Sequence, residues 1–461
     1  MTPPASTGQP AGAIDDEPLL PEFSAGGHGR GGGSVSGAVF NVSTSIVGAG
    51  IMSIPAAMRV LGVVPALFLI AAVAVLADVS VEFMLRYTGW AAGGGKKAKA
   101  TYAGIMGDAF GRAGAAVLNV FIAFTTAGTL VVYLIIIGDV MSGSVGGGDE
   151  HAGVLQELFG PQWWTGRQFV LLVTAVFVLL PLVLRRRVDS LRFTSAISIL
   201  LAVVFMLISL GIALYALFKG TATMPRMLPD FSRLSSPFEL FTAVPVIVLA
   251  FTFHFNVHPI RAELSKTSDM KTAVRISLVL CAAIYAAVGF FGYLLFGDAT
   301  MADVLANFDR SSGAGVPQAL NDAARLSYAL HLVLVFPLLL FSLRVNVDEL
   351  LFPGRRPLAA DTRRFVSLTA VLMAVLYALA IAIPSIWTLF EYSGSTFAVT
   401  ISLIFPGAIV LKDVHGIAKR KDKALAAMMI ILAVVTSSIA IASNIMSSIS
   451  DKVRGGHVAS R

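Results

Sequence analysis

Cysteine is nearly absent from this 461-residue chain, and charged side chains are scarce. The single cysteine, Cys281, excludes an intramolecular disulfide and any metal site built from several thiolates. Charged residues make up 13% of the chain, 56% of its residues are hydrophobic, and its mean hydropathy is +0.81. Soluble domains carry about 25% charged residues. The composition therefore predicts a protein that crosses a membrane many times.

Sequence motifs for nucleotide binding are missing as well. The glycine-rich tracts at 31–33, 93–95 and 146–148 lack the Gly-Lys-Ser/Thr ending of a phosphate-binding loop. The sequence also lacks metal-ligand clusters and the Gly-x-Ser-x-Gly turn of hydrolases. These absences argue against an ATP-driven pump and against a membrane enzyme. We expect no enzymatic activity, no cofactor and no metal.

Long apolar runs dominate the rest of the sequence. About eleven are long enough to cross a bilayer as helices, at residues 36–60, 64–88, 113–139, 167–185, 191–218, 237–258, 271–296, 322–343, 364–383, 386–411 and 422–447. We therefore predict an all-α polytopic membrane protein surrounded by lipid.

The net charge of +7 does not indicate nucleic-acid binding, because the basic residues gather in alternate loops rather than in one patch. Most of the 34 Lys and Arg residues fall on the cytoplasmic side if the amino terminus is cytoplasmic. The positive-inside rule predicts that orientation. An odd number of spans then places the carboxyl terminus in a lumen or outside the cell.

The chain divides into two tails and one large domain. Residues 1–33 are rich in Gly, Pro, Ser and Ala, which predicts a disordered cytoplasmic tail without a cleaved signal peptide. Residues 34–447 form the expected transmembrane domain, and 448–461 a short lumenal or extracellular tail. The segment Asp15–Leu20 resembles acidic dileucine signals for vacuoles and lysosomes, although an acidic disordered stretch explains it equally.

Small and polar residues interrupt the first apolar run between Ser43 and Pro55. Irregular backbone at this depth persists only inside protein or beside a polar cavity. A broken helix offers free amides to a carboxylate and free carbonyls to an ammonium, so an α-amino acid suits it. Close helix packing by small residues is the alternative. The candidate binding residues are Ser43, Thr44, Ser45, Gly48, Ala49, Gly50 and Ile51.

The sixth run has a matching interruption between Pro245 and Pro259, where Thr252, His254 and Asn256 are candidate substrate ligands. Paired breaks in the first helix of each block of five predict an inverted five-plus-five repeat, followed by one extra C-terminal helix. Histidine titrates near neutral pH, so His254 is also a candidate for ion coupling. The alternative is a neutral imidazole that caps a free carbonyl.

Three further polar positions lie within apolar runs. Asp78 is a candidate for ion coupling, unless it is simply paired, and Glu82 is expected to pair with Arg86 one turn away. Tyr133 either projects its hydroxyl into a central cavity or belongs to an interfacial belt. The polar cluster at 390–396 is expected either to narrow one end of a pathway or to pack helices closely.

Three segments resemble the amino acid/auxin permease family. They are the string Gly37–Pro55, the pattern His254, Pro259-Ile260 and Glu263-Leu264, and Phe405-Pro406-Gly407. The branch that the chain resembles most is the plant vacuolar amino-acid transporters related to sodium-coupled neutral amino-acid transporters. The resemblance implies alternating access, with a neutral amino acid at the Gly48–Gly50 break.

The resemblance also bears on ion coupling. Asn41 matches a position that helps coordinate sodium in the animal members, whereas Val335 replaces their threonine ligand in helix eight. A hard cation needs oxygen ligands, so we favour proton coupling or facilitated movement over sodium symport. A sodium-coupled symporter, an amino-acid sensor without appreciable flux and a channel remain the alternatives. An endomembrane such as the vacuole is the expected location, and the plasma membrane is the alternative.

Overall fold

The computed structural model describes residues 33–93, 100–143, 153–185, 191–222, 224–232, 237–309, 316–355, 358–383 and 393–458. Within these ranges the backbone is helical, apart from connecting turns and one isolated β-bridge between Gly33 and Leu264. The expected tail and its dileucine-like segment lie outside the described residues, apart from Gly33, and so do Glu391 and Tyr392 of the polar cluster in helix ten.

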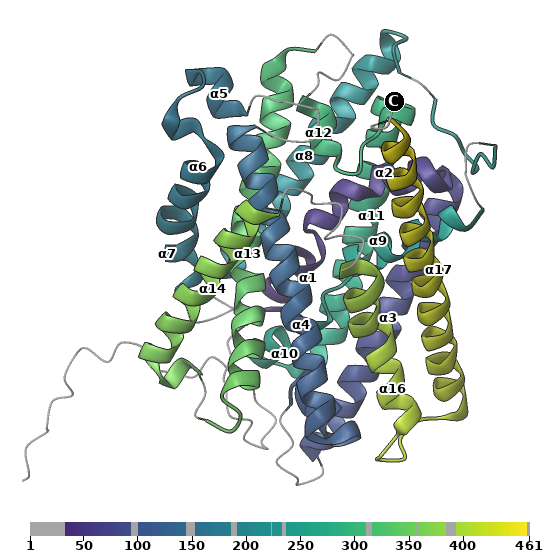
Figure 1. Ribbon diagram of the computed structural model, residues 1–461. Helices are drawn as coiled ribbons and strands as arrows, with labels where there is room; N and C mark the ends of the chain where they lie inside the picture. The colour runs from purple at the N-terminus through teal and green to yellow at the C-terminus, as the bar shows by residue number, and fades with distance from the viewer. Residues whose placement is uncertain are drawn as a thin grey trace, which may run out of the picture.

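Every predicted span has a helical counterpart (Figure 1). Within the described ranges, nine helices are long and apolar enough to cross a membrane, or ten when the bent pair Val35–Ile46 and Ala49–Leu61 counts as one span. The shorter apolar helix Arg167–Val183 coincides with the predicted fourth span. The other spans are α3 (Val63–Gly93), α4 (Tyr102–Ser142), α8 (Arg192–Phe218), α11 (Met270–Phe296), α13 (Gln318–Leu351), α14 (Thr362–Ala382) and α17 (Arg420–Val458). Helix α4 is kinked at Gly111, whose φ is 71°.

The first span is broken where the sequence predicts it. Helix α1 (Val35–Ile46) ends before Gly48, whose backbone is extended at φ −146° and ψ −156°. The chain resumes as a 3-10 turn, Ala49–Ser53, and then as α2 (Ile54–Leu61), at an angle of 49° to α1. Pro55 lies in the first turn of α2, where its missing N–H costs no hydrogen bond.

The sixth span is broken in the corresponding place. Helix α9 (Ala243–Ala250) stops before the non-helical residues 251–253, and α10 (His254–Glu263) follows. The start of α1 lies beside the end of α10, because the N–H of Gly33 donates to Glu263 O (3.2 Å) and its carbonyl accepts from Ser265 N (3.2 Å). The two broken spans therefore run in opposite directions, as an inverted repeat requires. Both lie in the middle of the bundle in Figure 1.

Helix ten is wound unusually. It consists of two wide π-helical stretches, Ser393–Ala398 and Thr400–Ile404, followed by α16 (Phe405–Lys412). Pro406 has no N–H to offer the carbonyl four residues earlier. That carbonyl, on Ser402, accepts instead from the hydroxyl of Ser80 on α3. The neighbouring carbonyl of Ile401 accepts from Tyr102 on α4 at 2.8 Å.

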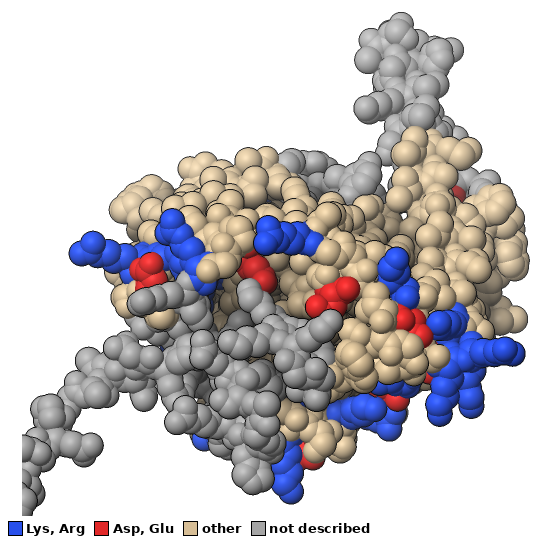
Figure 2. Space-filling view, turned by 90° about the horizontal axis from the view of Figure 1, so that it is seen from below, with Lys and Arg blue, Asp and Glu red and all other residues tan. Residues whose placement is uncertain are grey.

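Basic side chains gather around one end of the bundle. Figure 2 shows Lys and Arg side chains around the lower face of Figure 1, where α10 ends. Ion pairs hold neighbouring helices together there. Arg86 on α3 contacts Asp422 on α17 at 2.7 Å and Glu82 one turn away at 3.2 Å. The expected pairing of Glu82 with Arg86 is therefore observed.

Candidate functional site

The carbonyl groups at the break of the first span are already hydrogen-bonded. Tyr285 donates to Ile46 O at 2.6 Å, and Tyr328 donates to Gly48 O at 2.5 Å. Between them, His331 Nε2 lies 3.2 Å from Val47 O. We expected these carbonyls to be free for an ammonium group. Each oxygen retains a second lone pair, so a ligand would share these acceptors or displace the side chains.

The two breaks touch each other directly. The Tyr285 hydroxyl that contacts Ile46 O also lies 2.8 Å from Ala250 O, at the end of α9. The Tyr285 ring packs edge-on against Phe251, with 5.1 Å between centroids. A Cβ on Gly50 would lie only 2.8 Å from the Cα of Ala250. Glycine at this position therefore allows the backbones of the two broken spans to meet.

The amide side of the first break faces Tyr133. A Cβ on Gly48 would overlap the Tyr133 hydroxyl, and that hydroxyl accepts a hydrogen bond from the Ala49 N–H. Tyr133 is 2% exposed. It therefore lies at the break and not in an interfacial belt. The Ile51 N–H donates to Gly48 O at 3.2 Å, so this amide is engaged within the 3-10 turn rather than open to a carboxylate.

Several other candidates form a hydrogen-bonded chain between the two broken spans. The Ser45 hydroxyl donates to Asn41 O at 2.8 Å and accepts from Asn256 Nδ2 at 2.9 Å. Asn256 Oδ1 in turn accepts from the hydroxyl of Ser342 on α13. The side-chain oxygen of Asn41 is buried and has no partner within the described part of the chain. Asn41 therefore retains an oxygen able to meet a cation.

Ser43 and Thr44 face other helices. Thr44 donates to Ser195 O on α8 at 3.1 Å. The Ser43 hydroxyl is buried without a partner among the described residues, and its carbonyl accepts from Cys281 Sγ at 3.8 Å. Thr44 thus joins the broken helix to α8.

The candidates of the sixth span have different surroundings. Thr252 donates to Val248 O at 2.8 Å and contacts the Ser402 hydroxyl at 3.0 Å, which ties this break to helix ten. His254 is fully buried, and neither ring nitrogen has a partner in the described ranges. The structure therefore does not show the carbonyl-capping role that we considered for it. His258 contacts the Thr88 hydroxyl at 2.8 Å, a structural role.

Asp78 lies in an ion-pair cluster between α3 and α11, and none of its contacts reaches either break. Its carboxylate is 3.2 Å from Arg275 Nε, and the neighbouring Glu82 also contacts Arg275 (3.5 Å) and Lys271 (3.4 Å). Pairing explains an acid at this depth without a coupling role.

Sequence reasoning missed Tyr285, Tyr328 and His331. All three are completely buried and contact the first break. Tyr328 and His331 are three residues apart on α13, so they share one helix face, and their rings stack with 5.1 Å between centroids. Polar side chains on one face of a membrane-spanning run were the available signal.

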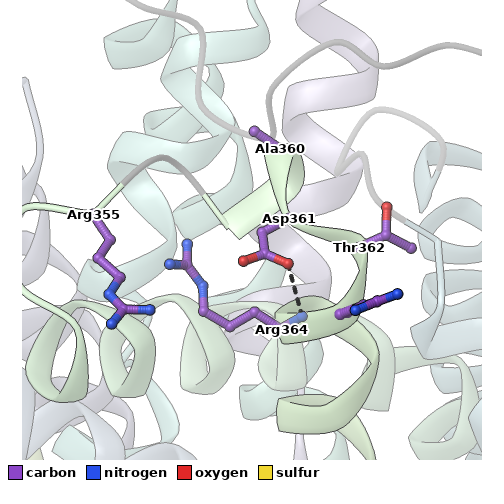
Figure 3. Close-up of a pocket in the computed structure, with 6 residues that line it drawn as sticks. Arg355, Ala360, Asp361, Thr362 and Arg364 are labelled. Atoms are coloured by element: carbon purple, nitrogen blue, oxygen red, sulfur yellow. Dashed lines mark hydrogen bonds between the residues drawn. The ribbon is translucent and has the colours of Figure 1, made fainter.

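A separate pocket lies on the surface where α13 meets α14 (Figure 3). Arg355, Asp361 and Arg364 are among its lining residues. The Asp361 side chain accepts from the Arg364 N–H at 3.1 Å and thereby caps α14. None of the lining residues belongs to a broken span, so this pocket is distinct from the central site.

Comparisons with known proteins agree with this architecture. The model of the family described as "Transmembrane amino acid transporter protein" matches residues 31–450. Amino acid transporter AVT6C of Arabidopsis thaliana is 53% identical over 93% of this chain and 97% of its own length. Sodium-coupled neutral amino acid transporter 7 of Danio rerio is 25% identical, over 83% of this chain and 80% of its own.

Among solved structures, the crystal structure of an Eremococcus coleocola manganese transporter is similar, with a TM-score of 0.56 and 15% identity. The match covers 90% of this chain and 88% of the other, and it shows the fold alone. The two curated relatives above are named as transporters and not as enzymes. From the family match and from its identity with AVT6C, the chain belongs to the transmembrane amino acid transporter family.

Proposed function

We propose that this protein moves neutral amino acids across a membrane by alternating access, either coupled to protons or by facilitated movement. The observation that carries the proposal is the meeting of two helix breaks at one buried hydroxyl. Tyr285 contacts the carbonyl of Ile46 from the first break and the carbonyl of Ala250 from the second. Backbone acceptors from both repeats therefore converge beside the amides of Gly48–Gly50.

An amino acid matches this arrangement of backbone groups. Its carboxylate would accept from amides at Gly48–Gly50, where a helical segment begins. Its ammonium group would take the place of the Tyr285 hydroxyl on the carbonyls of Ile46 and Ala250. No charged side chain contacts either break among the described hydrogen bonds and ion pairs, which supports a substrate with an uncharged side chain.

The closed state of the site supports alternating access. The breaks are sealed by Tyr285, Tyr328 and Tyr133, all less than 3% exposed. A substrate can reach the Gly48–Gly50 segment only if these contacts open. Because the two repeats run in opposite directions, opening from one side and closing from the other is the motion that this fold favours.

Proton coupling is preferred to sodium coupling because Val335 offers no oxygen where a threonine ligand is expected. In the described part of the first span, the side-chain oxygens of Asn41, Ser43 and Ser53 are buried without a partner, and Asn41 offers the only amide oxygen among them. The ion-coupling roles of Asn41 and His254 belong to this proposal, and so do the substrate contacts of Thr252 and Asn256.

The proposed orientation places the amino terminus in the cytoplasm, because the basic end of the bundle is the end where α1 begins and α10 ends (Figure 2). An endomembrane such as the vacuole is the proposed location. It is supported by the acidic dileucine-like segment Asp15–Leu20.

Uptake by purified protein in proteoliposomes tests the proposal. A panel of radiolabelled amino acids is offered with and without sodium and with and without a pH gradient. We expect flux of neutral amino acids without a sodium requirement. Binding without flux would favour the sensor alternative, a sodium requirement would favour the sodium symporter, and large unitary currents in electrical recordings would favour a channel.

A further inference from the structure

His331 on α13 connects three helices at the first break. Its Nε2 lies 3.2 Å from Val47 O at the end of α1. Its Nδ1 lies 2.7 Å from Ser198 O and 2.9 Å from the Ser198 hydroxyl on α8. The side chain is 0% exposed. One imidazole therefore joins α1, α8 and α13 at the point where the backbone of the first span is broken.

Both ring nitrogens of His331 face carbonyl oxygens, which accept hydrogen bonds and never donate them. A neutral imidazole carries one N–H, and an imidazolium carries two. Only the protonated ring can donate to Val47 O and Ser198 O together. The neutral ring keeps one of these bonds, and its bare nitrogen can then accept only from the Ser198 hydroxyl. The proton therefore decides which group of Ser198 bonds to the ring, the carbonyl when the ring is charged or the hydroxyl when it is neutral.

The groups around the ring are uncharged. Tyr328 stacks on it from α13, and the hydroxyls of Tyr285 and Tyr133 lie at the same break. Charged residues on the packed helices have contacts of their own. Arg325 pairs with Glu157 (3.4 Å) and Asp322 (3.5 Å), and Arg344 donates to Val183 O (3.0 Å). Helix α8 carries Arg192 as its single charged residue, at its first position, and α1 carries none.

We propose that His331 binds a proton during transport, in addition to the candidate His254, and that its protonation locks the Val47 end of the broken helix to Ser198 on α8. Loss of the proton releases the Ser198 carbonyl and leaves the weaker contact of the neutral ring with the Ser198 hydroxyl, which loosens the break relative to α8. This inference rests on the proposed amino-acid transport and names a further residue that would couple it to protons. The proton binds and leaves without any covalent step other than N–H formation.

The first test replaces His331 by Gln, whose amide can still donate a hydrogen bond but does not titrate. Proteoliposomes loaded with a pH-sensitive dye report proton entry on addition of a neutral amino acid. We expect H331Q to lose at least tenfold in amino-acid-driven proton entry and to lose stimulation by a pH gradient, while amino-acid exchange continues. The control H258Q changes a buried histidine that contacts Thr88 instead, and proton entry should persist.

The outcomes separate the two proposals. Gradient-driven uptake and proton entry that persist in H331Q overturn the assignment of His331. Amino-acid flux without proton movement in the unmodified protein also overturns it but leaves the transport proposal standing. A complete absence of amino-acid flux in the unmodified protein contradicts the transport proposal itself.

A second pair of variants keeps His331 and so does not depend on the folding of H331Q. Ser198→Ala removes the hydroxyl that can donate to Nδ1 of the neutral ring, and it leaves the Ser198 carbonyl in place. The protonated form gains relative stability. The pH of half-maximal uptake should therefore rise by about half a unit to one unit, which corresponds to the free energy of one hydrogen bond between neutral groups.

Ser195→Ala is the matched control. It lies one turn earlier on α8, its hydroxyl has no partner within the described residues, and its carbonyl contact with Thr44 is unaffected. S195A should leave the pH profile unchanged. An S198A profile that is unmoved, or that moves to lower pH, contradicts the proposal.

Discussion

Replacement of Tyr285 by Phe removes the one hydroxyl shared by the two helix breaks. The ring keeps its edge-on packing against Phe251, so the change deletes little more than an oxygen. The buried carbonyls of Ile46 and Ala250, which share its single O–H at 2.6 and 2.8 Å, then lose that donor. Unsatisfied buried acceptors cost about 1–3 kcal/mol, and hydrogen bonds inside membrane proteins average about 0.6 kcal/mol. We expect Y285F to lower the unfolding free energy by about 1–3 kcal/mol.

Bound substrate should change how much stability Y285F loses. If an amino-acid ammonium replaces the Tyr285 hydroxyl on these carbonyls, the bound states of the variant and the unmodified protein should be similar in stability. The loss should therefore shrink at saturating amino acid, and the thermal shift caused by the substrate should be larger in Y285F. Thermal unfolding of purified protein in detergent, with and without substrate, measures both quantities.

Tyr293→Phe serves as the control for this experiment. Tyr293 lies on the same helix, α11, and its hydroxyl accepts from Arg226 Nε at 3.0 Å, away from both breaks. Its loss of stability should not depend on substrate. Equal losses in Y285F with and without amino acid would refute the idea that the hydroxyl occupies the place of the ammonium group.

Three other substitutions test separate parts of the structure. Gly48→Ala should abolish transport because its Cβ overlaps the Tyr133 hydroxyl, and the added change Tyr133→Phe should restore part of the uptake measured in proteoliposomes. Burial raises the pKa of Asp303 to about 6, so the folded protein holds more protons than the unfolded chain between about pH 4 and 6, and stability falls as pH rises there. Asp303→Asn should remove about 3 kcal/mol of this pH dependence in thermal unfolding, and an unchanged slope would contradict the assignment. Asp413→Ala should destabilise the turn between α16 and α17 by about 1–3 kcal/mol in the same assay. Asp413→Asn keeps an oxygen that accepts from Tyr87 and tolerates the positive φ of 42°, so it loses only the ion pair with Lys423. Equal losses of stability in the two variants would refute this account.

The sequence predicts the spans and both breaks, because span length and interruption by Gly and Pro are local properties. It does not predict which side chains seal the breaks. Tyr285 and His331 lie 239 and 284 residues from the carbonyls that they contact, and such pairings depend on how helices pack. Asp78 illustrates the same limit. A single sequence does not reveal its partner Arg275, which lies 197 residues away.

The motif Phe405-Pro406-Gly407 in helix ten, one of those that relate this chain to its family, has a structural role. In Phe405-Pro406-Gly407, the proline has no N–H for the carbonyl of Ser402, so this carbonyl accepts a hydrogen bond from Ser80 on α3. The glycine is also required for packing, since a Cβ on Gly407 would lie 3.0 Å from the side chain of Ile430 on α17. Both residues therefore contribute to the packing of helix ten against α3 and α17. This motif therefore identifies proteins built in the same way, and proteins that share it are free to carry different cargo.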